Sequence, residues 1–265
     1  EYSPAKLESY VANVLKLEAV ACKDWLTNKV DRSVTGKVAM QQCAGPLQLP
    51  LNNLGIVAMD YQGTTGISTA IGHSSISGLI NPEAGSRLAI AEALTNVIWA
   101  PVSAGLRGVS LSANWMWPAK NDGENARLYK AVKAVSDFAI ELGINIPTGK
   151  DSLSMTQKYP DGNTVYSPGT VIISAVGEVK DIRKAITPTI KTKSGTKIIY
   201  INLSSSSYEL GGSSFAQSLN KIGVNTPDVS DSKYFASTFA VIQNLISNGK
   251  ILSGHDISAG GMITT

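Results

Sequence analysis

The sequence predicts an α+β fold built of mixed α/β layers. Three strand-like runs, at residues 54–61, 109–116 and 170–179, are separated by segments with helical periodicity. Of the 265 residues, 43% are hydrophobic, which is enough to bury a substantial core. We therefore expect one large domain or two ordinary ones.

The first part of the chain contains the most regular patterns. Residues 1–27 show helical spacing and form a leading helical segment, and a first domain follows over 28–186. Within that domain, the run LAIAEALTNVIWA at 88–100 is apolar on nearly all sides, which is typical of a buried helix. The amphipathic stretch at 123–142 predicts a second helix that ends at Gly143 as a C-cap.

A change of composition predicts a domain boundary. The segment DIRKAITPTIKTKSGTK is polar and basic, and Pro188 and Gly195 interrupt regular structure there. We expect a second α/β domain over 187–265, which is truncated because Thr265 falls in the first turn of another helix. Its predicted elements are strands at 197–203 and 250–254, a helix near 215–222, and a helix with Phe235, Phe239, Ile242 and Ile246 on one side.

Composition argues against several functional classes. The net charge is only +3 and no Lys or Arg run is interleaved with aromatic residues, so we expect no nucleic-acid partner. No apolar stretch reaches the roughly 18 residues of a membrane span, and the start EYSPAKLESY does not resemble a signal peptide. Cys22 and Cys43 fit neither a disulfide framework nor a zinc site. We expect a cytoplasmic protein without a membrane partner, and the lack of Met at position 1 suggests a piece of a longer chain.

The buried helix at 88–100 carries three polar side chains, Glu92, Thr95 and Asn96. Their spacing of i, i+3 and i+4 places them on one face across a single turn. A buried carboxylate needs a cation or a set of hydrogen-bond donors. Oxygen ligands of this kind suit Mg²⁺ better than zinc or copper, so the helix is a candidate metal site.

A second polar group lies in the segment HDISAGG, between a predicted strand and a predicted helix start. Loops at this position gather exposed N–H groups and the positive end of a helix dipole, which favours phosphate–metal complexes. Asp256 is a candidate Mg²⁺ ligand and Ser258 a candidate phosphate donor, while His255 alone is more often structural. The alternative, that these residues cap the following helix, stays open.

Three further segments are weaker candidates. GKDSLS, at 149–154, is predicted to be a loop in which Lys150 binds phosphate as a point charge, or else a solvated turn. Asp31 and Arg32 are an adjacent acid and base, an arrangement that usually marks a surface turn. ELGGSS, at 209–214, offers N–H groups to an anion but lacks the Lys of a P-loop, so a tight turn is the stronger explanation.

Six segments together closely resemble a known family. They are DRSVTGKVAMQQCAGPLQLP, AIAEALTN, LSANWM, IPTGKDSLSM, ITPTI and GHDISAGG, and they resemble the large, single-chain phosphoribosylformylglycinamidine synthases, or formylglycinamide ribonucleotide amidotransferases. The resemblance spans nearly the whole chain, with the motifs in family order. It implies the second of two aminoimidazole ribonucleotide synthetase-like units, an N-terminal domain followed by a truncated C-terminal α/β domain, without the family's glutaminase.

The resemblance also implies roles for individual residues. Glu92 and Asn96 match the family's Mg²⁺ ligands at a nucleotide site. Asp256 and Ser258 match a metal ligand and a nucleotide contact. Asn53 stands where the family has a further Asp ligand, and its amide oxygen can coordinate a metal but supplies no charge.

The family reaction, as the resemblance implies it, joins glutamine-derived ammonia to formylglycinamide ribonucleotide at the expense of ATP. The implied ligands are the ribonucleotide, Mg²⁺ and ATP or ADP, and Asp31, Arg32 and Lys150 are implied to face the productive site. The implied protein partners are the remaining domains of the full-length chain, glutaminase included. A homodimer formed through an exposed sheet is a further expectation.

Two other functions stay open at this point. In the first, this half is a catalytically silent scaffold that binds a structural ADP–Mg²⁺, and turnover takes place at the site related to it by pseudo-symmetry. In the second, the chain is a related ATP-dependent enzyme of the aminoimidazole ribonucleotide synthetase type, although EALTN, SANWM and GKDSLSM fit the amidotransferase better.

Overall fold

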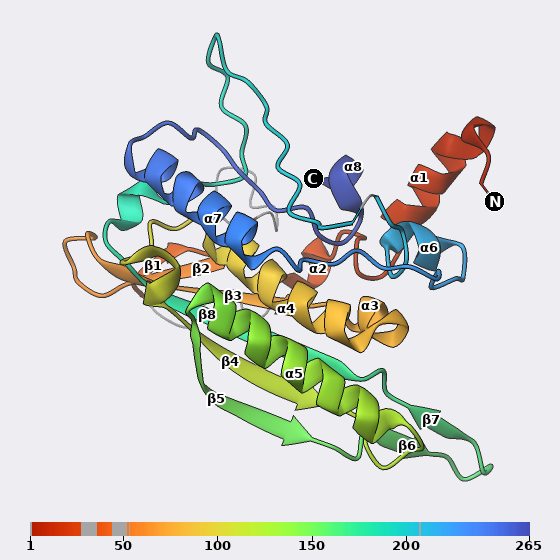
Figure 1. Ribbon diagram of the computed structural model, residues 1–265. Helices are drawn as coiled ribbons and strands as arrows, with labels where there is room; N and C mark the ends of the chain where they lie inside the picture. The colour runs from red at the N-terminus through yellow and green to blue at the C-terminus, as the bar shows by residue number, and fades with distance from the viewer. Residues whose placement is uncertain (1, 28–35, 44–51, 53, 207) are drawn as a thin grey trace.

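A six-stranded sheet forms the centre of the computed structural model, which describes residues 2–27, 36–43, 52, 54–206 and 208–265. The strand order is β1-β2-β3-β8-β4-β5 (Figure 1). β4 and β5 run parallel, and the other neighbours are antiparallel. A two-stranded hairpin, β6–β7, projects from one end of the sheet. The strands span Val38–Met40 (β1), Leu54–Ala58 (β2), Gly66–His73 (β3), Val109–Met116 (β4), Asn145–Ser152 (β5), Thr156–Lys158 (β6), Thr164–Tyr166 (β7) and Thr170–Val179 (β8).

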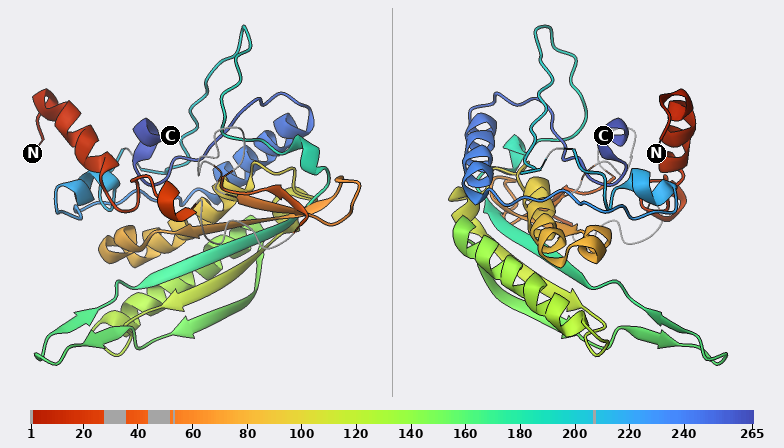
Figure 2. Two further views of the ribbon diagram at one scale, coloured as in Figure 1. Left: turned by 180° about the vertical axis from the view of Figure 1, so that it is seen from behind. Right: turned by 45° about the vertical axis from the view of Figure 1, so that its right-hand side comes forward.

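The main helices lie on one face of this sheet. α4 packs on β3 and β8, and α5 packs on α4 and β5. The view from behind in Figure 2 shows the strands in front of these two helices. Among the helices of the described segments, none combines the length and the apolar character that a membrane crossing requires. The helices span Leu7–Leu15 (α1), Asp24–Thr27 (α2), Ser75–Ile80 (α3), Pro82–Val97 (α4), Glu124–Leu142 (α5), Ser214–Ser218 (α6), Ser232–Ser247 (α7) and Gly261–Thr264 (α8), with short 3-10 turns at Pro4–Lys6, Gly105–Gly108 and Ile182–Lys184.

The opposite face of the sheet is exposed and partly apolar. Residues alternate along β3, so that one set is buried toward α4 and the other points away. We define the open face by four side chains that are 38% to 57% exposed: Val57, Ile67, Ile71 and Val176. These side chains come from the adjacent strands β2, β3 and β8.

The strongest sequence patterns correspond to observed elements. β4 and β8 cover the predicted ranges 109–116 and 170–179. α5 ends at Leu142, and Gly143 follows it with φ 69°, a left-handed conformation that glycine adopts without strain. These two strands and the helix at 123–142 are therefore confirmed, whereas the helix predicted near 215–222 is the shorter α6, Ser214–Ser218.

The buried helix is longer than its sequence pattern. α4 begins at Pro82 because Asn81 caps it: Asn81 Oδ1 accepts the N–H groups of Glu83 and Ala84, at 3.0 and 3.1 Å. It ends at Val97, three residues before the apolar run itself ends.

The prediction of a loop at GKDSLS was wrong. β5 continues to Ser152, parallel to β4, with Lys150 opposite Asn114. Most residues of this edge strand are exposed on both faces. The alternation of apolar and polar residues that identifies a half-buried strand is therefore missing from its sequence.

The strands predicted at 197–203 and 250–254 are also wrong. In the described part of the chain no neighbouring strand pairs with either segment, and an extended segment becomes a strand only through hydrogen bonds to a neighbour. Ile198 and Ile199 are accordingly 91% and 77% exposed. The helix predicted around Phe235 is confirmed as α7, whose buried face includes all four predicted side chains.

Several contacts attach the α7 region to the earlier part of the chain, among them an aromatic pair and an ion pair. Phe235 of α7 packs edge-on against Phe138 of α5, with ring centroids 6.0 Å apart. Arg87 of α4 donates two hydrogen bonds, of 2.8 and 2.6 Å, to the carboxylate of Asp228 just before α7. A bidentate pair of this kind fixes orientation as well as distance.

Candidate functional site

A close approach of α4 to β3 positions the polar face of the helix. A Cβ atom at Gly72 would lie 2.2 Å from the carbonyl oxygen of Ala89 and 2.3 Å from the nitrogen of Ala93. Any larger residue would push the helix away from the strand. Side chains of α4 can therefore reach the main chain of β3.

Glu92 and Asn96 both bind the main chain of β3. Glu92 Oε2 accepts the N–H of His73 at 2.7 Å, and Asn96 Nδ2 donates to the carbonyl oxygen of Ile71 at 3.0 Å. Thr95 instead donates to the carbonyl oxygen of Glu92, within its own helix, at 3.2 Å. The face predicted from the i, i+4 spacing is thus formed by the carboxylate and the amide, without the hydroxyl.

The amide of Asn96 is only partly satisfied. Asn96 is 5% exposed, and within the described residues its Oδ1 accepts no hydrogen bond. Leaving a buried acceptor unpaired costs about 1–3 kcal/mol. The free oxygen is consistent with a partner from outside the chain, such as a water molecule or a cation.

Asp256 brings a second carboxylate to this helix from a distant segment. It is 8% exposed, and His255 Nδ1 lies 3.1 Å from its Oδ1. Burial, which is the largest cause, and the charge of Asp256 raise the pKa of Glu92 above its ordinary value, whereas the N–H and the charge of His73 lower it. A cation bound here would stabilise the ionised form of Glu92 against both burial and the charge of Asp256.

The donor set fits Mg²⁺ in chemistry. Two carboxylates and an amide oxygen are hard oxygen ligands, and Mg²⁺ commonly keeps waters or phosphate oxygens at its other positions. The described segments contain no cluster of three or more His, Cys, Asp or Glu side chains suited to a metal ion. The site therefore depends on Asn96, and on any ligand that a bound phosphate would add.

Other predicted site residues are not brought to this cluster by contacts in the described part of the chain. Ser258 is exposed, and its carbonyl oxygen accepts the N–H of Gly261 at 3.0 Å. Lys150 is exposed on β5, where its ammonium group donates to Ser152 Oγ. Asp31, Arg32 and Asn53 lie outside the described residues.

The N–H groups of the two glycines in ELGGSS are already used in hydrogen bonds to main-chain carbonyl oxygens. The N–H of Gly211 donates to the carbonyl oxygen of Asn225 at 2.8 Å, and that of Gly212 donates to Ile222 at 2.7 Å. Gly212 has φ 77°, and a Cβ atom there would lie 2.6 Å from Ser77 Oγ. These contacts support the tight-turn explanation over an anion site.

Sequence reasoning missed the contribution of His73 and its strand. The alternating run GISTAIGH forms β3, and its last residue donates to Glu92 and lowers the pKa of that carboxylate. The sequence holds no clear signal for this strand, because its large apolar residues Ile67 and Ile71 lie on the exposed face. The partner of Glu92 could not be deduced from the sequence either, because a main-chain contact depends on how the helix docks.

Comparison with known proteins agrees with this architecture. Residues 22–178 match the model of the family described as FGAR-AT PurM_N-like domain. The solved structure "T. maritima PurL complexed with FGAR" superposes with a TM-score of 0.62 at 12% identity, covering 100% of this chain and 38% of that chain. At this identity the match supports the fold alone.

Curated relatives share much more sequence. The probable phosphoribosylformylglycinamidine synthase, chloroplastic/mitochondrial, of Arabidopsis thaliana is 45% identical over 95% of this chain and 18% of its own length. The phosphoribosylformylglycinamidine synthase of Homo sapiens is 42% identical over 95% of this chain and 19% of its own length. The chain thus spans about a fifth of the relatives it matches. The family resemblance seen in the motifs is confirmed, and the chain belongs to the FGAR-AT PurM_N-like domain family.

Proposed function

We propose that this chain is part of an ATP-dependent ligase of purine biosynthesis that converts formylglycinamide ribonucleotide to formylglycinamidine ribonucleotide. The nitrogen would come from glutamine as ammonia, released by a glutaminase in the remaining part of the enzyme. The proposal rests on the buried oxygen cluster of Glu92, Asn96 and Asp256 in a chain of this family. The compartment that we propose is the cytoplasm.

The cluster would hold Mg²⁺ with a nucleotide phosphate. Glu92 and Asp256 would supply carboxylate oxygens and Asn96 its unpaired Oδ1, and we propose Asn53 as a further amide ligand and Ser258 as a nucleotide contact. When bound, Mg²⁺ would neutralise phosphate charge. Because α4 is buried and its polar face is tied to β3, these oxygens are held in place before a ligand arrives.

A phosphorylated amide would make the ligase chemistry feasible. Transfer of the γ-phosphoryl group of ATP to the amide oxygen of the substrate turns that oxygen into part of a phosphate leaving group. Ammonia then attacks the imidate carbon, the C–O bond breaks, and phosphate departs. We propose that Asp31, Arg32 and Lys150 take part at this productive site, where cationic groups would stabilise the transferring phosphoryl group.

The scaffold alternative has an observation in its favour. Glu92 and Asn96 each bind the main chain of β3, so a metal at these residues would also fasten the helix to the sheet. A nucleotide held there would stabilise the folded protein by mass action without being consumed. In that case this half binds a structural ADP–Mg²⁺ and supports turnover elsewhere.

The metal-ligand proposal is tested by Glu92→Gln in the protein that contains this chain, with Glu83→Gln in the first turn of the same helix as control. Losing one charged ligand should weaken binding of Mg²⁺–ADP at least about tenfold, measured by isothermal titration calorimetry with and without EDTA. The control should bind as the unchanged protein does. Equal binding by both variants would remove Glu92 from the site.

Nucleotide exchange separates the two functions. During turnover, a catalytic site takes up labelled ATP on the timescale of product formation, whereas a structural site retains its original nucleotide. Exchange at this site as fast as turnover would exclude the scaffold function. The 265-residue chain alone is expected to form no product from glutamine, and measurable product would contradict its dependence on a separate glutaminase.

A second copy of this chain is the partner that we propose for the open face when the 265-residue chain is alone. The four defining side chains are large, apolar and adjacent, whereas soluble monomers usually bury or scatter such groups. A twofold pair would bring the same patch from each copy together.

A further inference from the structure

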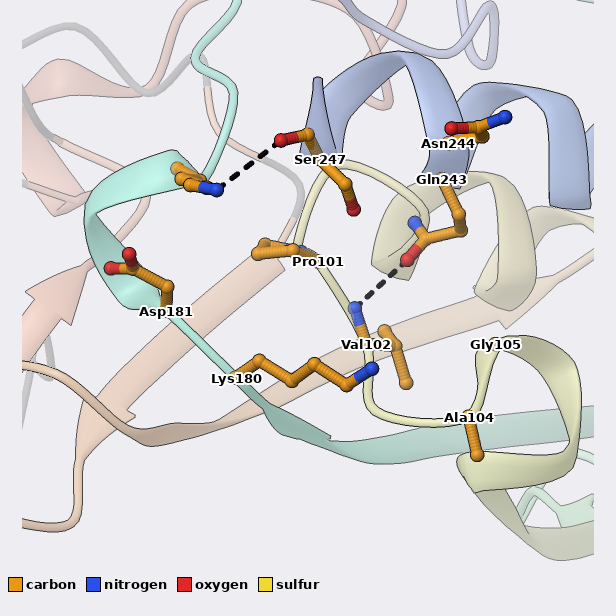
Figure 3. Close-up of a pocket in the computed structure, with 10 residues that line it drawn as sticks. Pro101, Val102, Ala104, Gly105, Lys180, Asp181, Gln243, Asn244 and Ser247 are labelled. Carbon is orange, nitrogen blue, oxygen red and sulfur yellow. Dashed lines mark hydrogen bonds between the residues drawn. The ribbon is translucent and has the colours of Figure 1, made fainter. Parts of the chain in front are cut away.

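A pocket of about 420 Å³ lies between the end of β8 and α7 (Figure 3). One wall is the loop after α4, with Pro101, Val102 and Ala104. The others come from Lys180 and Asp181 after β8, Lys184 of the following 3-10 turn, and Gln243, Asn244 and Ser247 of α7. None of these residues belongs to the cluster of Glu92, Asn96 and Asp256, so a ligand in the pocket would not require the proposed metal site.

The inner wall of this pocket is held rigidly. Gln243 is 8% exposed and uses both ends of its amide. Its Oε1 accepts the N–H of Val102 at 2.9 Å, and its Nε2 donates to the carbonyl oxygens of Ile98 and Ala100 at 2.6 and 2.9 Å. Figure 3 shows the first of these bonds joining α7 to the loop. The cavity is therefore preformed, because its two sides cannot separate without breaking buried hydrogen bonds.

The charge at the pocket is positive. Lys184 donates to the carbonyl oxygen of Ser247 at 3.2 Å, and within the described residues neither Lys180 nor Lys184 forms an ion pair. Asp181 is the carboxylate of the lining, and Arg183 binds both of its oxygens, at 2.8 and 2.9 Å. In Figure 3 the carboxylate of Asp181 points away from Val102 and Gln243. The hydrogen bond from Arg183 is the main cause that lowers the pKa of Asp181, and the charge of Lys184 adds to it. With two lysines and one carboxylate, the lining keeps a net positive charge.

The loop at the rim has an unusual backbone conformation. Ala104 has φ 60° and ψ 16°, the left-handed region that residues with a Cβ atom rarely adopt, and Gly105 follows with φ 60°. Such strain persists only where the surroundings impose it, and it is frequent at ligand sites. Ala104 lines the pocket together with Val102, and in Figure 3 its methyl group points away from Val102.

From these observations we propose that the pocket binds a small phosphomonoester. The doubly charged phosphate lies between the ammonium groups of Lys180 and Lys184, with Ser247 as a hydroxyl donor. The compact organic part packs on Pro101, Val102 and Ala104. A bound ligand joins the segment after β8 to α7 and so stabilises the attachment of α7 to the earlier part of the chain.

Binding is measured by isothermal titration calorimetry on the protein that contains this chain, with phenyl phosphate and inorganic phosphate as probes and EDTA present. Phenyl phosphate should bind more tightly than inorganic phosphate, because only the ester fills the apolar wall. The variant Lys180→Gln/Lys184→Gln should lose at least about tenfold in affinity for phenyl phosphate. The control Lys130→Gln/Lys158→Gln removes two exposed lysines outside the pocket and should keep its affinity.

Lysine footprinting locates the binding site in the unsubstituted protein, so its result does not depend on the stability of the variants. Acetylation by acetic anhydride, read by mass spectrometry, should slow at Lys180 and Lys184 when phenyl phosphate is present, and not at Lys130 or Lys158. Equal loss of affinity in both double variants, or equal protection of all four lysines, would show nonspecific charge attraction and overturn the proposal. The absence of measurable binding at millimolar phenyl phosphate would overturn it as well.

Discussion

Glu92 is a carboxylate on a buried helix, and its environment makes it sensitive to pH. Burial is the main cause that raises its pKa, and the charge of Asp256 adds to it. The raised pKa means that the folded chain holds this proton more tightly than the unfolded chain does. In the absence of metal, protonation of Glu92 therefore stabilises the folded state. This contribution to the free energy of unfolding is complete below the pKa that Glu92 has in the unfolded chain, and it is lost as pH rises through the pKa that it has in the folded chain.

The free energy of unfolding in EDTA should therefore decrease as pH rises across that window, with a slope from this residue of at most about 1.4 kcal/mol per pH unit. Glu92→Gln should abolish this part of the slope, because the amide does not titrate. Glu83→Gln should retain it. Urea unfolding at a series of pH values gives the free energy of unfolding of the unchanged protein and of both variants. An unchanged pH slope in Glu92→Gln would contradict the assignment of this slope to Glu92.

Prediction from sequence succeeded for residues whose geometry is local. The i, i+4 spacing of Glu92 and Asn96 fixes their common face once the helix is known. Their actual partners, the main chain at His73 and Ile71, lie 19 and 25 residues away in sequence and depend on how α4 docks on β3. The approach of Asp256 came from the family resemblance, because no local pattern connects residues so far apart.

At the scale of elements, the close contact of α4 with β3 depends on one glycine. Gly72→Ala would place a methyl group within 2.3 Å of the helix backbone at Ala89 and Ala93. We expect a cost of about 1–3 kcal/mol in the free energy of unfolding, because the helix must shift. The shift should also weaken Mg²⁺–ADP binding, because Glu92 and Asn96 move with the helix.

Gly36→Ala is the matched control for Gly72→Ala. Within the described residues, no atom lies within 4 Å of a Cβ atom built at Gly36, so the free energy of unfolding should change by no more than about 0.5 kcal/mol. Chemical denaturation gives both values, and calorimetry gives the affinity. Equal stability of the two variants would mean that α4 adapts to the methyl group without loss.

Element prediction failed where a strand depends on its neighbours. β5 is an exposed edge strand with no apolar alternation, yet pairing with β4 makes it regular. The segment 197–203 has the opposite character: its β-branched residues suit a strand, but it has no strand neighbour in the described chain. The β-propensity of a segment describes how well its residues fit a sheet. It does not show whether a neighbouring strand is available for pairing.

At the scale of the whole molecule, the sheet has one face covered by helices and one open face. Antiparallel sheets can leave one face in water, but that face is then usually polar. Here Val57, Ile67, Ile71 and Val176 form an apolar patch over three adjacent strands. Charged residues placed in this patch should prevent association of two copies without disturbing the core beneath α4 and α5.

The test is Ile71→Lys/Val176→Lys, with Ile140→Lys on the exposed side of α5 as control. Sedimentation equilibrium of the 265-residue chain should show a concentration-dependent dimer, because the open face removes apolar area from water only when it is paired. The double variant should sediment as a monomer with an unchanged circular dichroism spectrum, and the control should dimerise as before. A monomer at every concentration of the unsubstituted chain would exclude a second copy as the partner. Loss of the dimer in Ile140→Lys as well would place the contact on the helical side, where α5 and not the sheet meets its partner.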